Sequence, residues 1–375
     1  MTSKERYKKA FSNTGTPDRV PFEPGLDFDT TVDLSGLNSW EYEDQGSTSL
    51  GENMLWSKKL GFDLYHYAAG IPEPVPGDGI DVSEKKWEQD DLRITETNVT
   101  TPSGTIRQRR RFPKHGPSFT YEKFIKNLPE DWAVFREYFG EDWVVNPRYF
   151  EEYKRVGDLG VTGVVVHSPI DWWGEYRHGG IEQTIYDLYD HPKLMEEIFA
   201  HYRKQSFAYL EKAAKLDPRP DFIIIHGSSC SGSVISPSFF RRSVLPYLQE
   251  ASALLKKHEI PSMFHCCGKS REWVEYVADS DINVMDALEC PPTGNVDLAE
   301  VKRLYGDRLC LKGNVSVLVM VNGTRGEVRD EVKRCIDSAA AGGGFVLSIG
   351  DSIGPKANLA NIEEMVQTAL EYGKY

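Results

Sequence analysis

Eight short apolar runs, most of them followed by a helical pattern, constrain the fold of this 375-residue chain more than any other feature. Parallel strands need helical crossovers, so this alternation predicts a parallel α/β sheet. The predicted strands lie at residues 20–23, 62–67, 161–167, 222–226, 260–266, 282–288, 309–312 and 345–349. Apolar residues at three- and four-residue spacing predict helices at residues 237–257, 270–278, 297–305, 327–341 and 359–372. Eight such units predict a (β/α)8 TIM barrel, and we expect residues 1–375 to form one domain.

One segment, at about residues 85–113, breaks this alternation. Leu92, Ile94 and Thr97 alternate along an extended stretch, which ends at the turn formed by residues 102–104 and is followed by a second extended stretch. Two such stretches predict a β-hairpin inserted after the second strand. The sequence leaves open whether this hairpin roofs the site or only packs against the edge of the barrel.

Composition excludes several classes of protein. The formal net charge of −13 argues against nucleic-acid binding, which depends on basic surfaces. No apolar run approaches the ~20 residues of a membrane span, and residues 1–7 are charged where a signal peptide would be apolar. We therefore expect a cytoplasmic protein. Because the cytoplasm is reducing, we expect no disulfide bonds. The sequence leaves open whether the protein forms a homodimer.

Two soft metal ligands, His265 and Cys267, stand at the end of the fifth predicted strand. Residues i and i+2 of an extended chain point to the same face, so both can bind one ion while Cys266 points away. Zn²⁺ favours imidazole and thiolate, and a catalytic site needs about three protein ligands. The third ligand is either Cys290 or Asp351. The alternative role of Cys290 is that of a buried thiol, and the alternative role of Asp351 is that of a helix cap.

Glu289 could serve as a displaceable fourth ligand of this ion. A structural zinc site would instead use paired Cys-x₂₋₄-Cys motifs, which the sequence lacks. The pattern therefore favours catalytic zinc, which can activate a leaving group or a nucleophile.

Further polar and aromatic residues fall near the carboxyl ends of predicted strands, where barrel enzymes place their active sites. Glu23, Asp27 and Glu289 are the candidate proton donors or acceptors, if burial raises a carboxyl pKa toward neutrality. Aromatic side chains would suit a planar ring or a methylated cation, although they could equally be packing residues. The candidate substrate-binding residues are Phe22, Tyr67, His167, Trp172, Trp173, His226 and Asn314.

Several motifs together resemble the uroporphyrinogen decarboxylase superfamily, and more narrowly its cobalamin-dependent methyltransferase branch. They lie along the whole chain, at residues 2–6, 17–22, 265–268, 288–298, 312–315 and 358–362. The resemblance implies a single-domain (β/α)8 barrel and a zinc ion bound by a His-x-Cys pair, here His265 and Cys267, and by a distant cysteine. That cysteine should follow the last strand, where this chain has Asp351, so Asp351, Glu289 or Cys290 must replace it.

The resemblance also implies a methyl group that moves between a small methylated substrate and a corrinoid carried by a partner protein. The chain has no Asp-x-His-x-x-Gly corrinoid motif of its own. The decarboxylase branch carries an Arg-Gln-Ala-Gly-Arg box after its first strand, whereas residues 21–27 contain two acids and no arginine. We therefore expect a zinc-dependent methyltransferase, with tetrapyrrole decarboxylation, or methyl transfer from the corrinoid protein to a thiol or folate, as alternatives.

Overall fold

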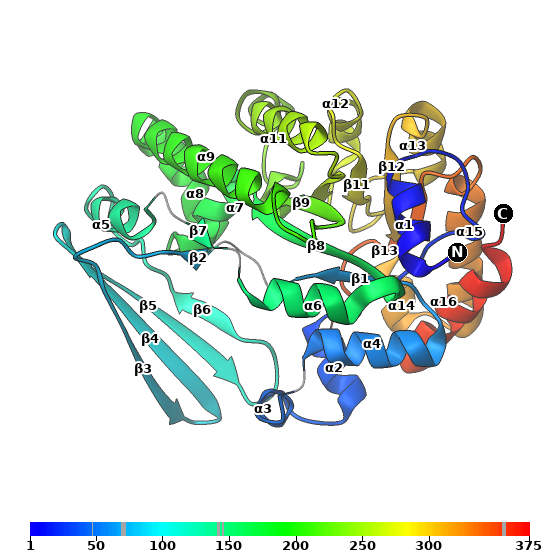
Figure 1. Ribbon diagram of the computed structural model, residues 1–375, viewed down its shortest axis with the longest axis horizontal. Coiled ribbons are helices and arrows are strands. Elements are labelled where there is room, and N and C mark those ends of the chain that lie inside the picture. Colours follow the sequence, from blue (N-terminus) through cyan, green and yellow to red (C-terminus); the bar gives the residue numbers. More distant parts are fainter. Residues whose placement is uncertain (47, 69–72, 141–142, 145, 355–357) are drawn as a thin grey trace.

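A curled sheet of seven parallel strands organises the fold (Figure 1). The computed structural model describes all residues except 47, 69–72, 141–142, 145 and 355–357. In spatial order the strands are β1 (Leu64–Tyr67), β8 (Gly160–His167), β9 (Phe222–His226), β10 (Ser262–Cys266), β11 (Val284–Ala287), β12 (Cys310–Val315) and β13 (Phe345–Ile349). These strands confirm seven of the eight predictions, with boundaries shifted by a few residues.

The first predicted strand, at residues 20–23, is present only as an isolated bridge between Phe22 and Leu347 of β13. Its backbone nevertheless reaches both edges of the sheet, because Glu23 N donates to Leu347 O at 3.1 Å and Asp63 N donates to Phe22 O at 2.9 Å. The predicted closed barrel of eight regular strands is therefore observed as a curled seven-stranded sheet with a bridging segment between its edges.

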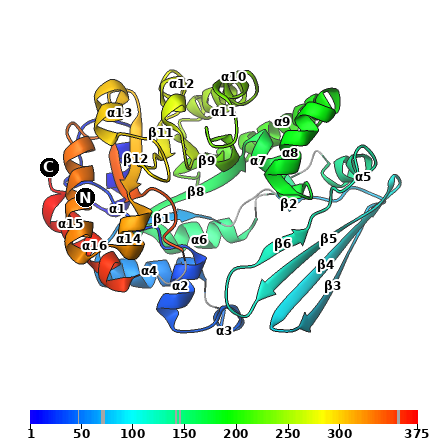
Figure 2. The same cartoon turned by 180° about the vertical axis from the view of Figure 1, so that it is seen from behind.

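Helices surround the parallel sheet (Figure 1, Figure 2). Those that follow its strands are α7 (Pro169–Tyr176), α8 (Gly180–Asp190), α9 (Pro192–Ala214), α10 (Pro237–Phe239), α11 (Leu245–Lys257), α12 (Val274–Ala278), α13 (Leu298–Tyr305), α14 (Val317–Asn322), α15 (Arg325–Ala339) and α16 (Leu359–Tyr372). The others are α2 (Phe28–Ser35), α3 (Ser39–Asp44), α4 (Ser49–Leu60), α5 (Glu130–Tyr138) and α6 (Arg148–Val156). No helix in the described part of the chain is long and apolar enough to cross a membrane.

Helix α1 (Ser3–Phe11) covers the amino-terminal end of the sheet. It begins with a capping box, in which Thr2 Oγ1 accepts from Glu5 N and the Glu5 carboxylate accepts from Thr2 N. Its buried face packs into the interior of the sheet, where the Phe11 and Phe222 rings lie 5.7 Å apart. With this end filled by apolar side chains, the opposite end, formed by the carboxyl termini of the strands, remains for a site.

The insertion is larger than the predicted hairpin. It forms a four-stranded antiparallel sheet in the order β3 (Asp81–Gln89), β4 (Leu92–Thr101), β5 (Gly104–Pro113) and β6 (Phe119–Glu122). The predicted hairpin corresponds to β4 and β5, which pair from Leu92–Pro113 to Thr101–Gly104. This sheet stands beside the parallel sheet in both views (Figure 1, Figure 2). The short strands β2 (Glu73–Pro74) and β7 (Trp143–Val144) pair with each other in a separate antiparallel sheet.

A fully buried carboxylate, Asp63, joins the N-terminal segments to the sheet. It accepts hydrogen bonds from Arg6 Nη1 at 3.0 Å, from Arg19 Nη1 and Nη2 at 2.5 and 2.9 Å, and from Phe22 N at 3.1 Å. A buried charge with several partners is costly to leave incomplete. Asp63 therefore holds helix α1 and the bridging segment against the start of β1.

We expect Asp63→Ala to lower the free energy of unfolding by about 3–5 kcal/mol, because it leaves two guanidinium groups without their buried partner. Asp18 is the matched control, since it also pairs with Arg6 but its side chain is 43% exposed. Asp18→Ala should cost less than about 1 kcal/mol. Urea unfolding followed by circular dichroism measures both values, and equal losses would contradict this role of Asp63.

Candidate active site

Four polar residues form one row across the carboxyl ends of adjacent strands. The strand register pairs His167 of β8 with His226 of β9, His226 with His265 of β10, and His265 with Asp286 of β11. The rings of His226 and His265 stack with centroids 4.8 Å apart, and those of His167 and His226 lie 5.4 Å apart. Burial, then the neighbouring imidazoles, lowers the pKa of His226 to about 3, so this ring is neutral near pH 7.

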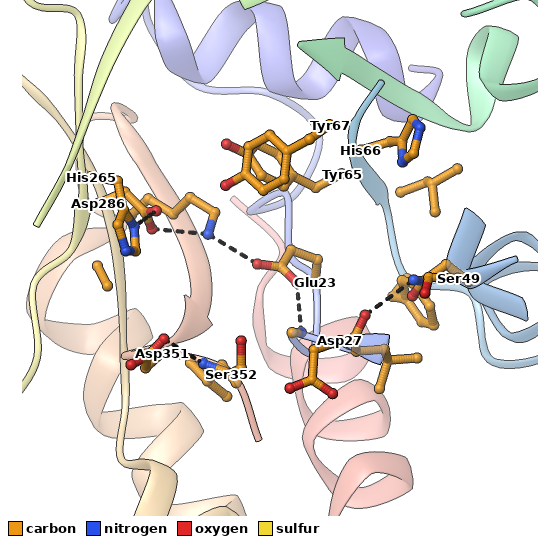
Figure 3. Close-up of a pocket in the computed structure, with 18 of the residues that line it drawn as sticks. Glu23, Asp27, Ser49, Tyr65, His66, Tyr67, His265, Asp286, Asp351 and Ser352 are labelled. Atoms are coloured by element: carbon orange, nitrogen blue, oxygen red, sulfur yellow. Dashed lines mark hydrogen bonds and ion pairs between the residues drawn. The ribbon is translucent and has the colours of Figure 1, made fainter. Parts of the chain in front are cut away.

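A chain of charged groups continues this row. His265 Nδ1 donates to Asp286 Oδ2 at 2.7 Å, and Lys312 Nζ donates to Asp286 Oδ1 at 2.9 Å and pairs with Glu23 Oε1 at 3.0 Å (Figure 3). Burial alone would lower the pKa of His265, but its hydrogen bonds to Asp286 and Cys267 raise it to about 10. Burial opposes the charge of Asp286, yet Lys312 and His265 hold the pKa of that carboxyl below its usual range.

Three potential metal ligands converge beside this charged chain. One ligand atom each from Cys267, Glu289 and Asp351 lies within 4.8 Å of the others. Cys267 follows β10, Glu289 follows β11 and Asp351 follows β13, so the convergence results from the curl of the sheet. Gly268 N donates to Glu289 Oε1, which holds that carboxylate against the turn after β10.

The donor atoms of this cluster fit a zinc ion. Thiolate, carboxylate and imidazole are all zinc ligands, and a histidine that binds zinc commonly donates its other ring N–H to a carboxylate. His265 meets this requirement, because Nδ1 donates to Asp286 and the ring also interacts with Cys267. Cys266 is fully buried on the other side of the chain, in agreement with the predicted alternation.

Cys290 lies outside the cluster formed by Cys267, Glu289 and Asp351. Burial, followed by the charge of Glu331, raises the pKa of the Cys290 thiol, and Arg334 is also among its charged neighbours. The structure thus places Asp351 and Glu289, rather than Cys290, beside Cys267.

A cavity of about 400 Å³ opens next to the charged chain (Figure 3). The candidate residues that line it are Glu23, Asp27, Tyr67, His226, His265 and Asp351. Its wall also includes Asp286, Lys312 and Tyr65, together with Ser49 and Asn53 of α4. None of the described residues of the β3–β6 sheet lines this cavity, so that sheet does not roof it.

The other candidate substrate-binding residues lie outside the described lining of the cavity. Trp172 stacks on Tyr202 with centroids 4.4 Å apart, and Trp173 Nε1 donates to Asp187 Oδ2 at 3.1 Å. Both tryptophans and Phe22 are buried in the core. Contrary to the expectation, these three rings therefore pack in the core and do not line the described cavity.

Two further candidates are polar residues outside the cavity wall. Asn314 is fully buried, where its Nδ2 donates to Leu288 O at 3.0 Å and its Oδ1 accepts from Arg334 Nη2 at 3.1 Å. The first bond ties β12 to the end of β11 and the second ties it to α15, so both hydrogen bonds stabilise the fold. His167 packs against His226, and neither of its buried ring nitrogens has a hydrogen-bond partner in the described part of the chain.

Sequence reasoning missed Lys312 as a site residue. The signal was present, because Lys312 ends the apolar run Leu309–Leu311, and a lysine in a buried strand requires anionic partners. It did not reveal which carboxylates those partners were. Tyr65, Ser49 and Asn53 also line the cavity, and no motif marked them.

The fold and the site define an α/β protein whose reactive groups gather at the carboxyl ends of parallel strands, as in barrel enzymes. Residues 157–372, more than half of the chain, match the family described as "Uroporphyrinogen decarboxylase (URO-D)", and the chain belongs to this family. This match confirms the family resemblance seen in the sequence motifs.

The relatives include two kinds of enzyme. A uroporphyrinogen decarboxylase of Coxiella burnetii is 23% identical over 189 residues, which cover 49% of each chain. A methylcobamide:CoM methyltransferase of Methanosarcina barkeri is 30% identical over 160 residues, covering 42% of this chain and 44% of that protein. The chain thus spans about half the length of the curated relatives it matches.

The fold is also similar to a solved structure, a methyltransferase from Methanosarcina mazei. The two chains align over 99% of each, with a TM-score of 0.66 and 17% sequence identity. This likeness supports the fold over the whole chain, including the part before residue 157. The methyltransferase relatives, and not this structure, agree with the resemblance to the methyltransferase branch.

We expect the wild-type protein to bind about one zinc ion per chain and Cys267→Ser to lose most of it, because the site then lacks its thiolate. Cys290→Ser is the matched control and should retain about one zinc per chain. Elemental analysis of the purified proteins measures both. Zinc loss in the Cys290 variant, with Cys267→Ser unaffected, would show that the ligand set is different.

Proposed function

We propose that this protein is a zinc-dependent methyltransferase that moves a methyl group between a small methylated substrate and a corrinoid-carrying partner protein. The observation that carries the proposal is the convergence of Cys267, Glu289 and Asp351 beside the His265–Asp286 pair. The methylcobamide:CoM methyltransferases among the relatives support the same reaction class. The structural neighbour supports only the fold.

In this proposal His265, Cys267, Glu289 and Asp351 hold the zinc ion. A zinc ion there supplies Lewis acidity to the heteroatom that loses or gains the methyl group. Asp286 fixes the orientation of the His265 ring by accepting from Nδ1, which leaves the other ring nitrogen available as a ligand. Lys312 in turn holds Asp286 in place and binds Glu23 on its other side.

The cavity is the proposed substrate site because His265 and Asp351 belong both to its wall and to the ligand set. Glu23 pairs with Lys312 and accepts a hydrogen bond from Gly25 N at 2.6 Å. Because it already has these partners, its role in this proposal is to contribute to the charge of the cavity. Asp27 Oδ1 accepts a hydrogen bond from Thr30 N at 2.9 Å. Its other oxygen pairs with no cation among the described residues, and we assign to it the exchange of the proton that balances a departing alcohol or thiol.

Tetrapyrrole decarboxylation is the competing function, because decarboxylases are among the relatives. A substrate with many carboxylates needs cationic groups in its site. The described cavity wall contains Glu23, Asp27, Asp286 and Asp351 but no arginine. Its charge therefore favours methyl transfer over decarboxylation of a polyanion.

The test of this function is methyl transfer to free cob(I)alamin from a panel of methoxylated aromatic and N-methylated compounds. The wild-type protein loaded with zinc should consume the Co(I) absorption band with at least one of them. His265→Ala and Cys267→Ala should abolish this activity, because each removes a zinc ligand. Asp286→Asn should reduce zinc affinity by about 10–100-fold, as expected for a group that orients a ligand.

Cys290→Ser serves as the control and should keep the activity of the wild type. Circular dichroism checks that every variant is folded. Full activity in both ligand variants would overturn the zinc mechanism, and decarboxylation of uroporphyrinogen by the wild type, without methyl transfer, would establish the competing function.

A further inference from the structure

The cavity reaches both faces of the edge strand β1. Successive residues of a strand point to opposite faces of its sheet. Tyr65 stacks on Phe222 in the interior of the sheet, with ring centroids 4.9 Å apart. Leu64 instead packs with Leu50 of α4 on the outside of the sheet. Because Leu64 and Tyr65 both line the cavity, it extends around the edge of β1, from the interior of the sheet to helix α4.

This extension depends on the incomplete closure of the sheet. β1 is the edge strand next to β8, and on its other side the bridging segment contributes the bond from Asp63 N to Phe22 O. Pro21 and Pro24 have no backbone N–H, so this segment cannot form a regular ladder with β1. The carboxyl end of β1 therefore keeps a free edge, around which the cavity passes.

The two ends of the cavity differ in chemistry. Figure 3 shows His265 and Asp351 at one end and Ser49 at the other, and Glu23 and Asp27 lie between them in this view. We call the end beside α4 the outer part, which is lined by Leu26, Ser49, Leu50, Asn53, Phe62 and Leu64. None of these side chains is charged, so the outer part suits a neutral and largely apolar group.

Ser49 and Asn53 form the α4 wall of the outer part. They are four residues apart and therefore lie on the same face of the helix. Asn53 Nδ2 donates to Leu26 O at 3.1 Å, which holds α4 against the segment before α2. Both side chains are small, so a larger side chain at either position shortens the outer part.

The proposed partner protein needs the open end of the sheet. Helix α1 fills the amino-terminal end with apolar side chains, so cobalt must reach the methyl group from the carboxyl ends of the strands. In a displacement at a methyl carbon, the attacking atom and the leaving atom lie in line on opposite sides of that carbon. The rest of the substrate is attached to the leaving atom, and it therefore extends away from the corrinoid and into the cavity.

From these observations we propose that the outer part binds the body of a neutral methyl ether, whose ether oxygen lies at the zinc ligands, and that Ser49 and Asn53 limit the size of this body. This inference rests on the proposed methyl transfer and names the substrate class of the same cavity. An ether oxygen has lone pairs with which it can bind a metal ion. The volume of about 400 Å³ lies in the range of small-molecule sites.

The transfer from such a substrate balances in electrons and charge. The bond between oxygen and the methyl carbon breaks with its electron pair on oxygen, while the reduced cobalt of the corrinoid protein supplies the pair for its new bond to carbon. The leaving oxygen then takes up one proton, which is the exchange assigned to Asp27. The product is a neutral alcohol or phenol, whose body suits the same uncharged outer part.

The first test measures binding in the absence of any corrinoid. 4-Methoxyphenol and 3-(4-methoxyphenyl)propan-1-ol are neutral methyl ethers with a short and a long body, and isothermal titration calorimetry should show that the zinc-loaded wild type binds both. Ser49→Phe should weaken binding of the long ether about 10-fold or more and that of the short ether less than about twofold, because the added ring fills the outer part. Asn53→Gln adds one methylene and keeps an amide, so it should act in the same direction with a smaller effect.

Leu55→Phe is the matched control. It adds a ring to the same helix, at a side chain that is 58% exposed and outside the described lining of the cavity. This variant should bind both ethers like the wild type, and circular dichroism checks that every variant is folded.

A second measurement determines the orientation of the ligand in the wild type and needs no variant. With paramagnetic Co²⁺ loaded in place of zinc, nuclear magnetic resonance measures how strongly the metal relaxes each proton of the bound long ether. The methoxy protons should relax fastest and those of the terminal hydroxymethyl group slowest, because the body points away from the metal ligands.

The outcomes distinguish this inference from the function on which it rests. Equal effects of Ser49→Phe on both ethers, no binding of either ether to the wild type, or faster relaxation of the terminal protons overturns the assignment, even if methyl transfer is observed with other donors. A loss confined to the long ether, with the methoxy protons relaxed fastest, supports it. If the wild type then never methylates cob(I)alamin from these ethers or from the rest of the panel, the proposed reaction falls while the subsite stands.

Discussion

The buried ammonium group of Lys312 is the constraint on which the arrangement of the site depends. A buried lysine costs several kcal/mol in lost hydration unless anions surround it. Here Glu23, from the segment that bridges the sheet edges, and Asp286, at the end of β11, provide those anions. Because Asp286 also accepts from His265, one charged group sets the positions of side chains from three strands and the N-terminal segment. A shift in Lys312 would displace the candidate zinc ligand and the cavity wall together.

The same arrangement divides the site into two regions of different chemistry. On one side, Cys267, Glu289 and Asp351 converge, and the His265 ring interacts with Cys267, so that soft and hard donor atoms lie close together. On the other side the cavity offers tyrosine rings and carboxylates that no described cation balances, apart from those that Lys312 binds. The first region suits activation of a heteroatom, and the second suits recognition of the substrate that carries this heteroatom. Asp351 and His265 are common to both, so a substrate in the cavity lies beside the ligand cluster.

The parts that could be predicted from sequence are those that follow from periodicity and register. His265 and Cys267 share a face because they are two residues apart in a strand, and Asp351 approaches Cys267 because both follow strands of one curled sheet. The positions of the Trp172 and Trp173 side chains could not be predicted in this way, because an aromatic side chain after a strand can point toward the cavity or toward the helices. Tyr202 and Asp187, which hold these rings in the core, lie on α9 and α8, beyond any local pattern. The first strand was overestimated for a related reason, since Pro21 and Pro24 interrupt the backbone donors that a regular ladder needs.

Asp351 is the position at which this chain departs from the pattern of the methyltransferase branch, and the departure has a chemical consequence. A carboxylate carries the same formal charge as a thiolate, so the cluster keeps its net charge, but it is a harder donor that transfers less electron density to a metal. With Glu289 also close, the cluster offers one sulfur and two carboxylates where the resemblance predicts two sulfurs. Such a ligand set is harder than one with two thiolates, so a bound zinc ion is less suited to holding a soft thiolate substrate. The substitution and the acidic cavity therefore point in the same direction, away from an anionic thiol as the methyl acceptor and toward a methyl donor with a nitrogen or oxygen leaving group.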